Sequence, residues 1–103
     1  MRERDYRESR ICRILGNPSA YQILGLLQDG SRRQPTDIAK VLDRSLATVS
    51  VTLRLLRNAD LLRYEHQGRA TWYWLKYPAE VRRMRSALLD IVERTTRRLR
   101  KDR

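Results

Sequence analysis

Residues 36–58 read TDIAKVLDRSLATVSVTLRLLRN, and this stretch decides the fold. Apolar residues recur in it at steps of three and four in two separate runs, which predicts two helices. The runs are separated by Asp43-Arg44, a pair typical of a tight turn, and Thr36 and Ser45 are residues that cap helix starts. We therefore predict a short helix capped by Thr36, a tight turn, and a second helix over 45–58.

The second helix has one apolar face and one polar face. At about 100° per residue, Val49, Leu53 and Leu56 lie within about 60° of one another. The opposite face carries short side chains and one arginine, which are Ala47, Ser50, Val51, Arg54 and Asn58, with Thr48 on its flank. Short side chains let a helix lie deep in the DNA major groove, and arginine can bind a phosphate or a guanine. An ordinary amphipathic helix has the same pattern, so this helix alone does not decide the function.

Downstream of residue 58 the hydrophobic period changes. Residues 62–66 and 70–76 predict two strands, because the second contains the β-branched and aromatic run TWYWL and Gly68 suits a hairpin turn between them. After Pro78, a helix is predicted over 79–101. Two helices around a tight turn followed by a hairpin are the plan of a winged helix-turn-helix.

Upstream, two further helices are predicted. The first covers about 2–15, and the second begins with Asn17 as N-cap and Pro18 at the first helical position. The second helix ends at Asp29-Gly30. We predict a mainly α (α+β) fold in one domain over 1–103: four helices, a hairpin wing and a long C-terminal helix.

Apolar positions on the two terminal helices exceed what so small a core can cover. This surplus predicts a homodimer whose interface uses the helices at about 2–15 and 79–101. Its predicted residues are Ile11, Ile14 and Leu15 on the first helix, and Val81, Met84, Leu88, Ile91 and Thr95 on the last.

The chain is strongly basic. Its 103 residues include 23 Lys+Arg and 12 Asp+Glu, a formal net charge of +11. This charge favours nucleic acid as the partner over a membrane surface or an acidic protein. Most of the basic residues are arginine, whose planar group binds phosphate through two hydrogen bonds. A high arginine content also follows from a GC-rich coding sequence, so the charge alone leaves other readings open.

Several function classes are disfavoured by the composition. The length leaves no room for a separate cofactor domain, and no nucleophile–base set or phosphate-binding glycine loop is present, so we predict no enzyme and no cofactor. No apolar run reaches the roughly 20 residues of a membrane span, and no signal peptide is visible. A single cysteine, Cys12, suits a reducing cytoplasm.

Four stretches resemble the ArsR/SmtB family of winged-helix transcriptional regulators, and the resemblance covers about residues 11–76. They are NPSAYQILGLL (17–27), DIAKVL (37–42), SLATVSVTLRLLRNADLL (45–62) and GRATWYWL (68–75). The resemblance implies that helix 45–58 reads the major groove through Ser45, Thr48, Ser50, Val51 and Arg54. It implies that the wing, residues 66–70, contacts the minor groove or phosphates through Arg69. Ala47, Thr36 and Gln67 complete the predicted DNA-binding set.

Some positions depart from the family pattern. Asp43-Arg44 replaces a glycine and an apolar residue in the turn, and Leu46 replaces a polar, DNA-facing residue; we expect Leu46 to supply the packing that Arg44 lacks. Val51-Thr52 replaces a frequent basic residue and histidine. Asp60 replaces the glycine that ends the helix, and aspartate tolerates a left-handed backbone. The operator sequence is therefore expected to differ from those of the family.

Metal sensing is common in this family, but its known ligand sets are missing here. The stretch 34–41 has no Cys or His, and 79–103 has no His. Cys12 and His66 are too few for a tetrahedral site within one subunit, so no metal site is predicted. We expect Cys12 to fill a helix–helix contact, with a redox switch as the alternative, and His66 to be a solvated strand residue. The sequence names no small-molecule inducer.

Trp72 and Trp74 share one face of their strand, opposite Tyr73 and Leu75. We expect the two indoles to pack on the chain's own terminal helix; a dimer partner or a ligand is the alternative.

The function predicted is that of a homodimeric, sequence-specific regulator, a repressor, that binds double-stranded DNA at an inverted-repeat operator. A winged helix used for protein–protein assembly and a non-specific nucleic-acid-binding protein remain as alternatives.

Overall fold

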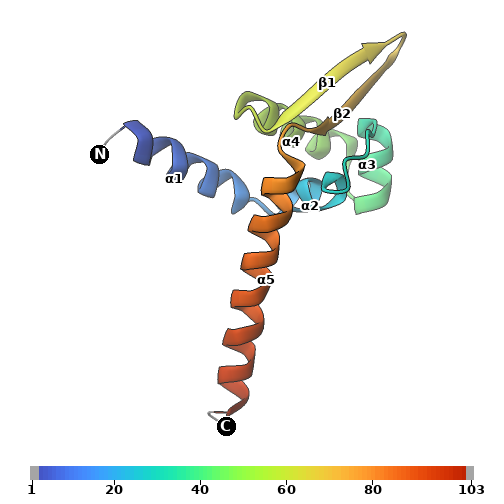
Figure 1. Cartoon of the computed structure of the whole chain (residues 1–103). Helices are drawn as coiled ribbons and strands as arrows, with labels where there is room; N and C mark the ends of the chain where they lie inside the picture. The colour runs from blue at the N-terminus through green and yellow to red at the C-terminus, as the bar shows by residue number, and fades with distance from the viewer. Residues whose placement is uncertain (1–2, 102–103) are drawn as a thin grey trace.

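The computed structural model describes residues 3–101, and its elements follow the predicted order (Figure 1). The mainly α (α+β) winged helix-turn-helix fold is confirmed. Figure 1 shows the hairpin leaving the helical body on one side, whereas α5 extends away from it in another direction. The elements are α1 (Glu3–Leu15), α2 (Pro18–Leu27), α3 (Pro35–Leu42), α4 (Leu46–Asn58), β1 (Leu62–Gln67), β2 (Ala70–Leu75) and α5 (Pro78–Lys101).

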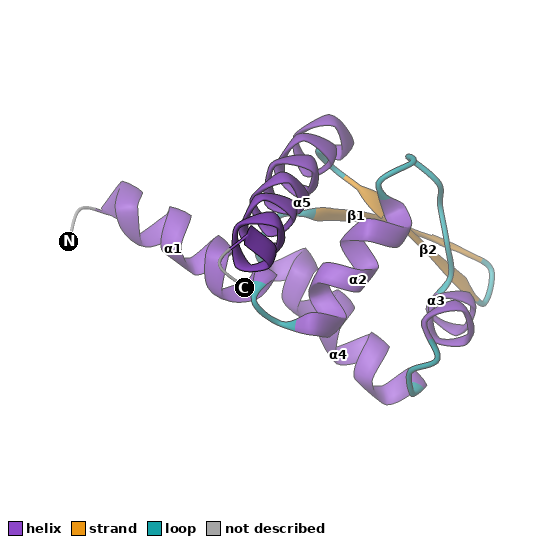
Figure 2. Cartoon of the chain, turned by 90° about the horizontal axis from the view of Figure 1, so that it is seen from below, coloured by secondary structure: helices purple, strands orange, loops and turns teal. Residues whose placement is uncertain are grey.

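The core lies where α2, α3 and α4 meet the base of the hairpin. Figure 2 shows the arrangement of these elements. All three predicted apolar residues of α4 are buried there, and Thr52 is buried with them. Its hydroxyl donates to the Thr48 carbonyl at 2.7 Å, which satisfies the polar group inside the core. The apolar core consists of Ile14, Ala20, Ile23, Leu24, Leu27, Ile38, Val49, Leu53, Leu56, Leu62, Leu75 and Val81.

The helix starts agree with two of the three predicted caps. The Asn17 side chain accepts hydrogen bonds from the amides of Ser19 and Ala20, and the Ser45 side chain accepts one from the amide of Thr48. The predicted cap at Thr36 is wrong. Gln34 is the N-cap of α3, because Pro35, whose fixed φ suits the first helical position, starts the helix one residue before Thr36.

The left-handed backbone expected at Asp60 is present, and Asp43 in the predicted tight turn adopts it as well. Asp43, which ends α3, has φ 52°, and Asp60, which follows α4, has φ 62°. Aspartate adopts this backbone conformation more readily than most residues other than glycine. The chain therefore makes the turn of the helix-turn-helix and the turn into β1 with carboxylate side chains.

Leu46 does not pack as predicted. Leu46 is 48% exposed, so it does not supply core packing. Arg44 is half-buried, and its Nε donates to Oε1 of Gln22 at 2.7 Å. A hydrogen bond between α2 and the turn thus replaces the apolar contact that the sequence suggested.

The hairpin pairs β1 with β2 in antiparallel register, from Leu62 opposite Leu75 to Gln67 opposite Ala70. Gly68 has φ +60° in the two-residue turn, as hairpin geometry requires. At the base, Lys76 Nζ donates to Oδ2 of Asp60 at 2.6 Å, and this hydrogen bond raises the pKa of Lys76. The base of the wing is thereby attached to the turn that follows α4.

No helix within residues 3–101 is long and apolar enough to span a membrane.

Candidate nucleic-acid interface

The outer face of α4 is exposed along its whole length. Ala47, Ser50, Val51 and Arg54 are all exposed, and Val51 is 64% exposed although it is apolar. Within the described residues the structure shows no ion pair to Arg54, so its guanidinium is available to an outside anion. A smooth, shallow face with one long cation has the shape that the major groove admits.

Two of the predicted contact residues already have structural roles. The Ser45 hydroxyl accepts from the Thr48 amide at 3.1 Å and donates to Oγ1 of Thr48 at 2.8 Å. These bonds cap the first turn of α4 and fix the Ser45 hydroxyl. The Thr48 hydroxyl keeps its donor hydrogen, so it can still bond a phosphate oxygen while it accepts from Ser45.

The wing carries its polar residues at the tip. Gln67 and Arg69 are exposed on either side of Gly68, where the hairpin projects furthest from the body (Figure 1). Behind the tip, Nδ1 of His66 and Oγ1 of Thr71 are 2.9 Å apart across the two strands. Thr36 is exposed near the start of α3.

The predicted dimer residues on the terminal helices fall into three groups by exposure. Ile14 and Val81 are only 5% and 7% exposed, because they pack in the core of their own chain. Their assignment to the dimer surface is therefore corrected. Leu15 and Met84 are partly buried against that core, whereas the others are exposed: Ile11, Leu88, Ile91 and Thr95.

Trp74 does not pack as predicted. Trp74 is covered by Arg32, whose Cζ lies 3.9 Å from the indole centroid, and Arg32 comes from the loop between α2 and α3. The expectation that the terminal helix covers Trp74 is wrong. Trp72, on the same face of β2, is half-buried.

The potential metal ligands do not form a cluster. Cys12 is exposed on α1, so the expected helix–helix contact does not form within the protomer. His66 is exposed on β1, as predicted. Among the residues that the structure describes, no three Cys, His, Asp or Glu side chains are grouped so as to hold a metal ion.

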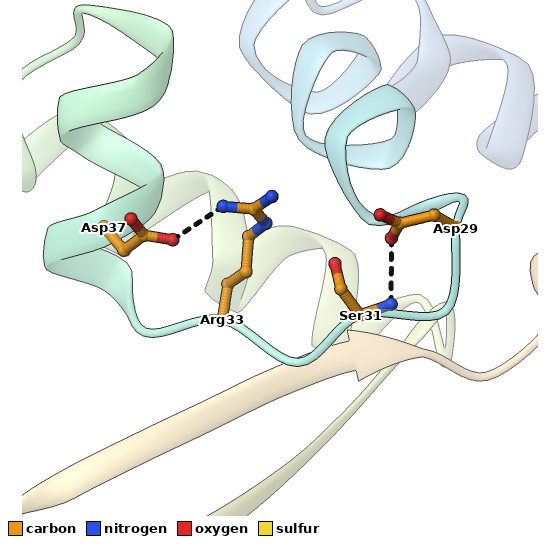
Figure 3. Close-up of polar contacts among 4 residues, drawn as sticks. All are labelled: Asp29, Ser31, Arg33 and Asp37. Atoms are coloured by element: carbon orange, nitrogen blue, oxygen red, sulfur yellow. Dashed lines mark hydrogen bonds and ion pairs between the residues drawn. The ribbon is translucent and has the colours of Figure 1, made fainter.

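Sequence reasoning missed the loop over residues 28–34. In this loop Arg33 forms an antiparallel bridge with Tyr73 of β2. Arg33 also reaches forward, and its Nη1 lies 2.8 Å from Oδ2 of Asp37 in α3 (Figure 3). A single bridging residue has no alternating pattern, so the sequence contains no signal for it.

Known proteins with similar sequences or structures share the helix-turn-helix described above. A family model described as a helix-turn-helix domain matches residues 15–65. No curated protein sequence matches the chain.

Among solved structures, HlyU from Vibrio cholerae is 22% identical with a TM-score of 0.74, over 88% of this chain and 97% of that one. NolR from Sinorhizobium fredii is 20% identical with a TM-score of 0.76, over 86% of this chain and 87% of that one. A homodimeric winged helix-turn-helix DNA-binding domain from Mycobacterium bovis, described as a possible ArsR-family transcriptional regulator, is 25% identical. Its TM-score is 0.70, over 90% of this chain and 87% of that one.

Proposed function

Residues 15–65 of this chain are a helix-turn-helix domain that resembles those of ArsR-family regulators, and from this premise we propose that the chain represses transcription as a sequence-specific homodimer. The family model is that of a helix-turn-helix domain, and one neighbouring structure is described as a DNA-binding domain of a possible ArsR-family transcriptional regulator. Both support a DNA-binding regulator rather than an enzyme. In the proposed complex, α4 lies in the major groove, and the wing contacts the minor groove or phosphates.

The observation that most directly supports sequence-specific binding is the outer face of α4. Ser50 and Val51 are exposed beside Arg54, on a helix that Val49, Leu53 and Leu56 anchor in the core. A rigid support lets the exposed side chains meet base edges in a fixed position, which is how a recognition helix discriminates sequences.

The distal part of α5 supports the dimer. From Leu88 onward every described side chain of this helix is exposed, including Ile91 at 59% and Leu99 at 62%. At helical spacing these residues share a stripe with Met84 and Thr95, and Figure 1 shows this part of α5 projecting away from the body. A second copy related by a two-fold axis would cover both stripes. The two recognition helices would then lie about 34 Å apart on one face of the duplex.

Selection of bound sequences from random duplex DNA tests the proposed function. We expect an enriched inverted repeat with a fixed spacing between half-sites. If bound sequences show no enrichment, the chain is a non-specific nucleic-acid-binding protein. If no duplex binds even at low salt, the fold serves protein–protein assembly instead.

Arg69→Ala is expected to weaken binding to all duplexes by a similar factor. The side chain is exposed at the wing tip. In the proposed complex it meets phosphates, so its loss should reduce the slope of log K against log salt by about one. Binding titrations at several salt concentrations measure both effects. Arg97→Ala, which removes the same charge from the polar side of distal α5, is the control and should leave the slope unchanged. A changed base preference with an unchanged slope would assign base reading to the wing.

Metal ions and arsenite are expected to leave DNA affinity nearly unchanged. A tight site needs about four donors, but Cys12 and His66 lie on separate elements, α1 and β1. One equivalent of zinc, copper or arsenite should change operator affinity by less than about threefold, below the usual allosteric range. Electrophoretic or fluorescence titration measures this. A tenfold loss that Cys12→Ser abolishes would instead place a metal site between two subunits.

A further inference from the structure

The loop between α2 and α3 pairs with the edge of β2 that faces away from β1. The Arg33 amide donates to the Tyr73 carbonyl at 3.0 Å, and the Tyr73 amide donates to the Arg33 carbonyl at 2.9 Å. β2 therefore has β1 on one edge and Arg33 on the other. Because a two-stranded hairpin alone is marginally stable, this bridge supports the wing from the helical body.

The neighbouring Arg32 contacts both strands of the wing at once. Its guanidinium lies over the Trp74 indole of β2 with Cζ 3.9 Å from the centroid, and its Nη1 is 3.2 Å from Oε2 of Glu65 in β1. Glu65 is paired with Trp72 in the register, so Glu65 and Trp74 are diagonal neighbours on one face of the sheet. Only a planar group can stack on the ring and still present an N–H to the carboxylate beside it.

The same loop is fixed to the helix-turn-helix. Oδ1 of Asp29 accepts from the Ser31 amide at 2.9 Å, which holds the turn after α2, and Arg33 pairs with Asp37 in the first turn of α3 (Figure 3). α3 in turn packs on α4. A continuous path of contacts therefore leads from the wing through residues 29–37 to the helix pair.

We propose that Arg32 is a positioning residue that sets the orientation of the wing relative to α4. This inference rests on the proposed function, because the orientation matters only if the wing and α4 bind one duplex together. Arg32 acts through Trp74 and Glu65 and makes no phosphate contact of its own. The wing tip is then placed against the DNA while α4 lies in the groove.

Two measurements test this inference with the variants Arg32→Ala and Arg32→Lys. Hydrogen exchange of the Arg33 and Tyr73 amides reports on the bridge without any DNA, and Arg32→Ala should accelerate it about fivefold, as expected for an exposed stacked cation. In DNA titrations, Arg32→Ala should lower affinity about fivefold with an unchanged salt slope. Arg32→Lys should recover little of this affinity, because lysine keeps the charge but cannot stack as a plane.

The matched control is Arg63→Ala. Arg63 stands opposite Trp74 in the register and carries the same charge, but within residues 3–101 it forms no ion pair. Affinity and exchange in this variant should stay within about twofold of the parent protein, as for most surface substitutions.

Other outcomes would overturn the assignment. Unchanged exchange in Arg32→Ala would show that Arg32 does not hold the loop. Faster exchange with unchanged affinity would show that the wing orientation does not matter. Restored affinity in Arg32→Lys, or a salt slope reduced by about one in Arg32→Ala, would make Arg32 a phosphate contact. If the parent protein binds no duplex, the proposed function fails, and the exchange data alone decide whether Arg32 holds the loop.

Discussion

Ile91→Asp is expected to convert the proposed dimer to monomers and to lower operator affinity by about 100-fold or more. Ile91 is 59% exposed within its own chain, so the substitution removes nothing from the protomer core. In the dimer it would place a carboxylate in the middle of the apolar stripe, where an unpaired charge is costly to bury. Two linked recognition helices bind more tightly than one by a factor of about 10² to 10⁴, and this gain is lost in a monomer.

Light scattering and DNA titration measure these two effects. Ser86→Asp is the control, because it adds the same carboxylate to the same helix at about 140° from Ile91, outside the stripe. This variant should remain dimeric and bind DNA normally. If the parent protein is monomeric at micromolar concentration in both low and high salt, the dimer proposal is wrong. If Ile91→Asp stays dimeric, the interface lies elsewhere.

Val51→Glu is expected to abolish specific DNA binding, with an affinity loss of about 100-fold or more. The Val51 side chain projects from the middle of the outer face of α4 and is 64% exposed. In the proposed complex a carboxylate there would be brought into the negative field of the duplex without a positive partner, and such like-charge contacts cost several kcal/mol. Because the position is exposed, the free energy of unfolding should change by less than about 0.5 kcal/mol, which thermal unfolding measures.

Val51→Thr is the matched variant for this test. It keeps the branched shape and adds no charge, so affinity should stay within several-fold while the preferred bases at one position of each half-site change. Random-duplex selection measures the preference. Normal binding by Val51→Glu would exclude α4 from the groove and favour a protein–protein role for this face.

The spacing of apolar residues was sufficient to predict the helices and strands and to separate the buried face of α4 from its exposed face. The steps of three and four in residues 36–58 correctly placed Val49, Leu53 and Leu56 in the core, and the predicted exposed face of α4 is exposed. Capping and turn chemistry also acts locally, so Asn17, Ser45 and Asp43 behave as their side chains predict. Thr36 was misassigned as the cap because Pro35, whose fixed φ suits the first helical position, starts α3.

Only the tertiary structure decided what covers each apolar or aromatic surface. Ile14 and Val81 belong to the same stripes as Ile11 and Ile91, yet the first two pack in the core and the others are exposed. The difference depends on where α1 and α5 leave the body, which periodicity does not encode.

The cover of Trp74 was likewise undetermined by the sequence. Its partner, Arg32, lies 42 positions earlier in the chain and reaches the indole because the Arg33 bridge brings the loop to β2. The amino-acid pattern of a segment predicts which of its faces is apolar and buried. Which group covers that face depends on contacts between residues that are distant in the sequence.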